Sequence, residues 1–162
     1  MKHLPFVVAR CRHRDQDPMA YYRAVADLTH GCDISIATAQ QMGLLLERLL
    51  EGQEWDEANL GLNTAIRHDS ISVERNYRGF CEDSWVLALQ LVQRRYRDDL
   101  DWERGIQCIM DLGGDTDTNA AIYGQLYGVL FPEEMIALYD SVRDSIHQSI
   151  LIDRRLDQLF AA

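Results

Sequence analysis

Residues 113–132 have the sequence GGDTDTNAAIYGQLYGVLFP, and this stretch predicts a sharp turn followed by a helix. Consecutive glycines favour a turn with positive φ, so the helix that precedes the pair has to end there. The next helix is expected from about Asp117 to Phe131. Small residues recur on one of its faces, at Ala120, Gly124 and Gly128, and they allow close approach of another helix. The stretch therefore predicts a tightly packed helix whose polar N-terminus is held at a fixed end of a bundle.

Apolar residues at helical spacing continue along most of the chain, and strand signals are scarce. We therefore predict an all-α fold, with residues 1–162 forming one single-domain helical bundle. A loop is expected over residues 70–79, and Phe6–Val8 is the one weak strand candidate. The other expected helices start and stop at capping residues, glycines and prolines. They run from Pro18 to near Gly31, from Asp33 or Ser35 to Gly52, from Trp55 to Ile66, from a cap at Asp83 or Ser84 to about Tyr96, from a cap at Asp101 to Gly113, and from Pro132 onward.

Composition excludes several classes of protein. A formal net charge of −10 argues against nucleic-acid binding, which needs a basic surface. The four cysteines lie far apart without a CxxC pair, which favours free thiols in a reducing compartment over a zinc cluster. The apolar stretch Leu4–Ala9 is too short for a secretory signal or a membrane span. We therefore expect a cytoplasmic protein without a membrane partner.

The polar residues after the glycine pair are candidates for a metal site. Asp115, Asp117 and Thr118 place two carboxylates and a hydroxyl within four residues at a helix start, and Mg²⁺ prefers such oxygen ligands. The helix N-terminus also favours negative charge at this position. The alternative is ordinary capping, in which Asp115 or Thr116 accepts hydrogen bonds from the first turn. The residues alone leave both interpretations open.

The string at 113–132 resembles the C-terminal metal motif of ADP-ribosylglycohydrolases, including the dinitrogenase-reductase-activating glycohydrolases. Leu28-Thr29-His30 resembles the Thr-His that precedes a long helix in that family. Residues 79–91, with Asp83 and Ala88, resemble the segment before the metal motif. The resemblance extends over roughly residues 24–132.

This resemblance implies an all-α bundle that uses magnesium ions to hydrolyse the bond between ADP-ribose and a protein side chain or small acceptor. The substrate would be ADP-ribose or an ADP-ribosylated molecule, and the implied cofactor is Mg²⁺. The resemblance implies two roles for residues of this chain. The metal ligands would be Asp115, Asp117 and Thr118, and the substrate would be contacted by Gly113, Gly114 and His30.

The chain departs from the family pattern at its beginning. Family members open with a Gly-Asp segment and an early Thr-Asp-Asp-Thr motif, which supply the opposing ligands and an acid, and this sequence has neither. Asp98-Asp99 and Glu82-Asp83 are poor substitutes, so the catalytic residue stays unknown. We expect only the family's C-terminal half. It would be completed by a second copy or a partner chain, or it would be an inactive ligand-binding or protein-interaction module.

Overall fold

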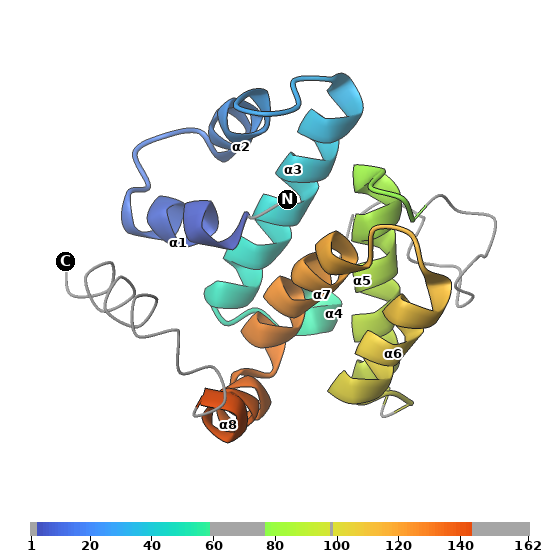
Figure 1. The fold of residues 1–162 in the computed structure, drawn as a ribbon. Helices are drawn as coiled ribbons and strands as arrows, with labels where there is room; N and C mark the ends of the chain where they lie inside the picture. The colour runs from blue at the N-terminus through green and yellow to red at the C-terminus, as the bar shows by residue number, and fades with distance from the viewer. Residues whose placement is uncertain (1–2, 59–76, 98, 144–162) are drawn as a thin grey trace. The chain divides into compact units, whose positions relative to one another are not determined.

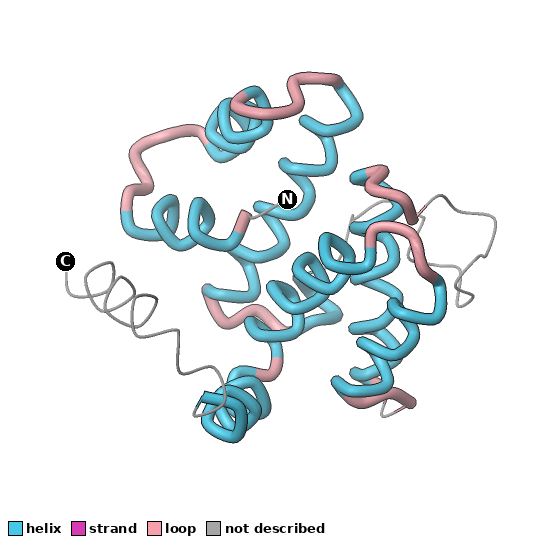
Figure 2. The backbone as a smooth tube through the Cα atoms, viewed as in Figure 1, coloured by secondary structure: helices cyan, strands magenta, loops and turns pink. Residues whose placement is uncertain are grey.

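The computed structural model describes residues 3–58, 77–97 and 99–143. In these ranges the backbone consists of helices joined by loops and turns, with no strand (Figure 2), which confirms the all-α prediction. The chain divides into two compact units, Met1–Leu130 and Phe131–Ala162. Of the second unit the structure describes one helix, α8 (Pro132–Arg143), which begins at the expected proline. The sites described below all lie in the first unit.

Seven described helices form the first unit (Figure 1). Their starts at Pro18, Asp33 and Trp102 agree with the sequence, as do the capping hydrogen bonds from Asp17 and Asp101. The helix predicted over 55–66 is described only to Ala58, and residues 59–76 lie outside the described ranges. The helices are α1 (Leu4–Arg12), α2 (Pro18–Asp27), α3 (Asp33–Leu50), α4 (Trp55–Ala58), α5 (Cys81–Tyr96), α6 (Trp102–Leu112) and α7 (Thr116–Leu130).

Two expectations were wrong, one about the type of an element and one about where a helix begins. The strand candidate Phe6–Val8 lies inside α1, because His3, Val7 and Arg10 are buried at the i, i+4, i+7 spacing of one helical face. Helix α5 begins at Cys81 rather than after a cap at Asp83 or Ser84. The acids of that segment lie within the first turn, where the helix dipole favours negative charge.

Helix α3 lies at the centre of the first unit, where it contacts α1, α2, α4, α5 and α7. Helix α5 is buried continuously from Ser84 to Val92, as expected for a core helix that packs on several sides. Helix α7 packs against α5 and α6. A Cβ added at Gly124 would lie 3.5 Å from the Trp102 ring, so this small residue accommodates an aromatic side chain of α6. These contacts hold the N-terminus of α7 in place.

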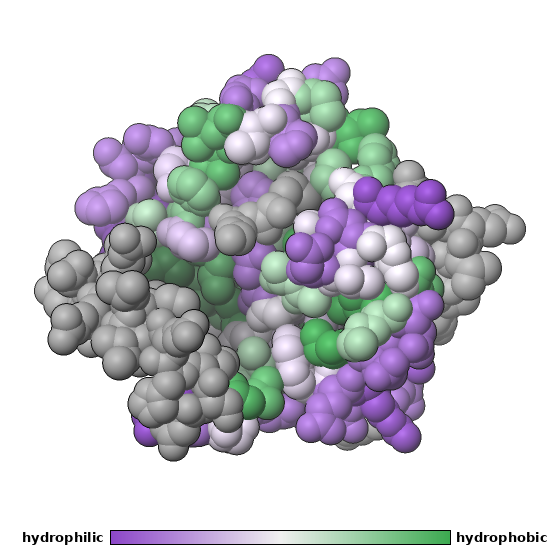
Figure 3. Space-filling model, viewed as in Figure 1, coloured by the Kyte–Doolittle hydropathy of each residue, from purple (hydrophilic) through white to green (hydrophobic). Residues whose placement is uncertain are grey.

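Large apolar side chains are also exposed on the first unit. Leu28 is 71% exposed and Met110 is 59% exposed. The space-filling view shows hydrophobic residues interspersed among hydrophilic ones (Figure 3). In the described ranges, no helix has both the length and the hydropathy that a bilayer crossing requires. Self-association through the exposed apolar groups stays a prediction.

Candidate metal centre and the adjoining cavities

The turn between α6 and α7 is built on two glycines. Gly113 and Gly114 have φ angles of 68° and 78°, a region that side chains rarely adopt. At Gly114 an added Cβ would lie 2.6 Å from the carbonyl oxygen of Tyr77. The same oxygen accepts the backbone N–H of Asp115 at 2.9 Å and the side-chain amide of Asn119 at 3.0 Å. The turn is therefore fastened to the segment that leads into α5, and only glycine fits against it.

This attachment also positions the Asp115 carboxylate. A Cβ at Gly79 would lie 2.9 Å from Asp115 Oδ2, so the carboxylate packs directly against the bare Gly79 backbone. A hydrogen bond with the Asp115 carboxyl, assisted by the backbone N–H of Thr118, lowers the pKa of Asp117 below its usual value. The two carboxyl groups are thus close neighbours. Two adjacent carboxylates attract a cation, since a cation relieves their mutual repulsion.

The contacts of the Asp115 carboxylate differ from those of the two aspartates that cap helices in the same unit. The carboxylates of Asp17 and Asp101 each accept a backbone N–H from the third residue of their helix, at 2.8 Å. The carboxyl of Asp115 instead meets Asp117 and faces a cavity. This geometry favours the metal-site interpretation over simple capping.

The cavity has a volume of about 370 Å³ and lies among the first turns of α3, α5 and α7. It brings His30 together with Asp115 and Thr118, which lie far from it in the sequence. Asp117 is exposed and, with Gly113 and Gly114, does not line this cavity. The two glycines shape the turn. The lining residues are His30, Cys32, Ile34, Ser35, Gly79, Phe80, Cys81, Ser84, Asp115, Thr118 and Ile122.

Several polar lining residues were not predicted. Ser84 is 1% exposed, and its hydroxyl has no hydrogen-bond partner among the described residues. A buried unpaired hydroxyl next to a cavity is a natural contact for a polar ligand. Cys32 and Ser35 lie close to His30 in the sequence, which was the one signal that could have suggested them. No sequence signal indicated that Ser84 lines the cavity, because its position there depends on how α5 packs.

The residues present fit part of a magnesium shell. Asp115, Asp117 and Thr118 offer hard oxygen donors from one turn, and the unpaired Ser84 hydroxyl lies on the same cavity wall. In the described ranges, no three His, Cys, Asp or Glu residues are grouped closely enough to hold a metal ion. The remaining ligands would come from water, from substrate oxygens, or from residues outside the described ranges or on another chain.

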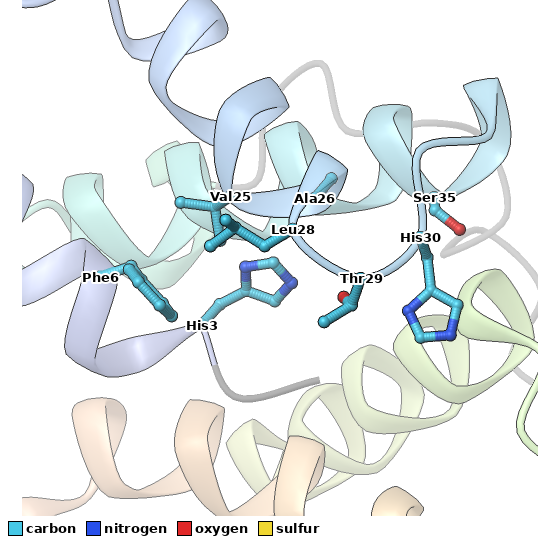
Figure 4. A pocket seen from close by; sticks show the side chains of 8 residues that line it. All are labelled: His3, Phe6, Val25, Ala26, Leu28, Thr29, His30 and Ser35. Atoms are coloured by element: carbon cyan, nitrogen blue, oxygen red, sulfur yellow. The ribbon is translucent and has the colours of Figure 1, made fainter.

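A second cavity of about 330 Å³ shares His30 and Ser35 with the first. Phe6, Val25 and Leu28 make its walls largely apolar, and the close-up view shows His3 and Thr29 between Phe6 and His30 (Figure 4). His3 is 5% exposed, and its Nδ1 has no hydrogen-bond partner among the described groups. Burial lowers the pKa of His3 to about 4, so its imidazole is neutral at neutral pH.

The low pKa of His3 predicts an acid-sensitive contribution to stability. The unfolded chain binds a proton at this histidine near pH 6.5, whereas the folded chain binds it only near pH 4. Since the unfolded state binds more protons in that window, its population rises as the pH falls. Allowing for partial solvent screening, we expect about 1 kcal/mol of this loss between pH 7 and pH 5.

His3→Asn should therefore show a smaller fall in the free energy of unfolding between these pH values than the unsubstituted chain, measured by urea denaturation. The exposed His13 offers a matched control, and His13→Asn should keep the full loss. An identical pH dependence for His3→Asn and the unsubstituted chain would show that His3 does not titrate as described.

These features define an all-α protein with an acidic turn beside a cavity that both polar and apolar side chains line. The model of the ADP-ribosylglycohydrolase family matches residues 1–162, a wider range than the resemblance of residues 24–132. The chain belongs to the ADP-ribosylglycohydrolase family. No curated protein and no solved structure gives a significant match to it.

Proposed function

We propose that this chain takes part in magnesium-dependent hydrolysis of ADP-ribose linkages. The observation that carries the proposal is that Asp115, Thr118 and His30, from two distant parts of the chain, line one cavity. Family membership supplies the reaction class. The local geometry supports it, because Asp115 and Asp117 bring two carboxyl groups together at the edge of that cavity.

In this proposal Asp115, Asp117 and Thr118 would hold Mg²⁺ through their oxygen atoms. Magnesium bound there would supply a Lewis acid and make a nearby water easier to deprotonate. The contact with Gly79 fixes the orientation of the Asp115 carboxylate, so little ordering is needed when a cation arrives. The imidazole of His30 can hydrogen-bond a ribose hydroxyl or a phosphate on the same wall.

The buried hydroxyl of Ser84 has a complementary role in this proposal. It has no partner among the described residues, so a polar group of the substrate would satisfy it. The apolar cavity beside His30 would exclude water from one side of the bound molecule. These residues would bind and orient the substrate, and within the described ranges we assign no group that protonates the departing acceptor.

The second candidate function is a non-catalytic module that binds ADP-ribose-like ligands or another protein. It is favoured by the small number of ligands, because only two carboxylates meet at the candidate centre within the described ranges. A centre of this kind would bind magnesium weakly and depend on the ligand to complete the shell.

The two functions are separated by measuring release of ADP-ribose from an ADP-ribosylated peptide, with Mg²⁺ or with a chelator. Release that requires Mg²⁺ supports the hydrolase. Calorimetric binding of ADP-ribose without turnover supports the module. If neither release nor binding occurs, and Mg²⁺ leaves the melting temperature unchanged, the hydrolase and the ADP-ribose-binding module are both wrong, and only a protein-binding module is left.

A further inference from the structure

Two thiols, one immediately before α3 and one at the start of α5, lie near the same hydroxyl in the wall of the candidate metal cavity. Cys32 precedes the first turn of α3, and Cys81 is the first residue of α5. The hydroxyl of Ser35 lies 3.2 Å from Cys32 Sγ and 3.7 Å from Cys81 Sγ. All three residues line the cavity that contains Asp115. Both cysteines are free thiols.

The surroundings of the two thiols differ. Cys32 is exposed, and the hydroxyl and backbone N–H of Ser35, with the N–H of Ile34, lower its pKa. Cys81 is half-buried, and its thiol donates a hydrogen bond to Thr38 Oγ1 at 3.8 Å. A thiolate is the nucleophilic form of cysteine, so the accessible Cys32 is the reactive partner, and the half-buried Cys81 is its neighbour across Ser35.

We propose that Cys32 is an oxidative modification site, at which a hydroperoxide forms a sulfenic acid that Cys81 resolves as a Cys32–Cys81 disulfide. In the first step the Cys32 thiolate attacks one peroxide oxygen, the O–O bond breaks, and the leaving hydroxide or alkoxide takes a proton from water. In the second step Cys81 loses its proton and attacks Cys32 Sγ, and the hydroxyl of the sulfenic acid leaves as water. Sulfur is oxidised and the peroxide is reduced in equal measure.

The position of Cys32 makes this step feasible. It lies outside the regular part of α3, in the extended backbone that precedes the helix, so its side chain can turn toward Cys81 without unwinding a turn. Ser35 is 7% exposed and lies between the two sulfurs, where it can pass a proton from one to the other. A bond between Cys32 and Cys81 would join α3 to α5 across the cavity.

The consequence for the site rests on the proposed function. A disulfide in the wall that contains Asp115 and Ser84 would narrow the cavity and block ligand entry, so oxidation would turn ligand binding off. The thiol chemistry itself does not depend on hydrolase activity. The two ideas can therefore fail separately.

The test treats the full chain with hydrogen peroxide and maps the products by peptide mass spectrometry. We expect a Cys32–Cys81 disulfide at peroxide concentrations that leave Cys11 and Cys108 reduced. Cys11 is a matched internal control, because it is half-buried and burial raises the pKa of its thiol. In the untreated chain, iodoacetamide should alkylate Cys32 about fivefold faster than Cys11 at neutral pH, and Ser35→Ala should slow the Cys32 reaction about threefold.

Two variants separate the roles of the thiols. Cys81→Ser should accumulate a sulfenic acid at Cys32 that is trapped by dimedone, whereas Cys32→Ser should leave Cys81 unmodified under the same conditions. Equal alkylation of Cys32 and Cys11, or oxidation of Cys32 in the unsubstituted chain without a link to Cys81, would overturn the proposal. If the disulfide forms while the chain shows no hydrolysis and no ligand binding, only the proposed function fails.

Discussion

Replacing Asp115 with asparagine is expected to weaken Mg²⁺ binding by roughly 100-fold, because the change removes a charged ligand from the inner shell. The free energy of unfolding should stay within about 0.5 kcal/mol of the unsubstituted value, since asparagine has the same size and caps helices well. The hydrogen bond with the Asp117 carboxyl can also be kept, because the amide of asparagine can donate to that carboxylate. Binding is measured by titration calorimetry, and stability by urea denaturation.

Asp117→Asn should have the same direction of effect on binding. Asp101 provides the matched control, since its carboxylate accepts the Arg104 N–H at 2.8 Å at the start of α6, away from the cavity. Asp101→Asn should leave magnesium affinity unchanged. If Asp115→Asn destabilises the fold without changing ion binding, the aspartate is a cap and the metal centre has to be abandoned.

Local chemistry accounts for the parts of the fold that could be predicted. Asp17 and Asp101 cap their helices as expected, since both act on the N–H groups of the turn that follows them. The end of α6 at Gly113 is equally local, because positive φ at consecutive glycines requires no information from elsewhere in the chain. Each of these signals involves residues within one or two turns of each other.

Features that depend on packing were not predictable in the same way. Helix α1 was taken for a strand candidate because Phe6–Val8 is a short apolar run, and such a run does not distinguish the two structures. Its assignment depends on burial of Val7 and Arg10 against α3. The cavity walls contributed by Ser84 and Cys81 likewise follow from the contact of α3 with α5.

The candidate site contains residues that could be predicted from the sequence and residues that could not. Asp115 and Thr118 could be selected from their spacing behind the glycine pair, but the residues alone did not place His30 near them. Only the family resemblance suggested His30, and the structure places it on the same cavity. The carbonyl oxygen of Tyr77, which fixes the turn, had no signal in the sequence, because a backbone atom makes the contact.

The largest effect on stability is expected from a substitution at Gly114, which lies against the Tyr77 carbonyl oxygen. Gly114→Ala should lower the free energy of unfolding by about 3 kcal/mol, from a strained positive φ and the loss of one or two hydrogen bonds. Gly114 has a φ of 78°, and its new Cβ would lie 2.6 Å from the Tyr77 oxygen, which has to move. Its movement disrupts the hydrogen bonds from Asp115 and Asn119. Urea denaturation measures the loss.

A substitution at Gly52 separates backbone strain from the contact with Tyr77. The φ of Gly52 is similar, at 85°, and a Cβ added there meets no atom within 4 Å. Gly52→Ala should therefore cost only about 1 kcal/mol, from backbone strain alone. The difference between the two variants measures the attachment of the turn to Tyr77. Since the same attachment positions Asp115, Gly114→Ala should also weaken magnesium binding, whereas Gly52→Ala should leave it unchanged. Equal costs for the two variants would mean that the turn relaxes away from Tyr77 freely, and the argument that it holds Asp115 against Gly79 would then fail.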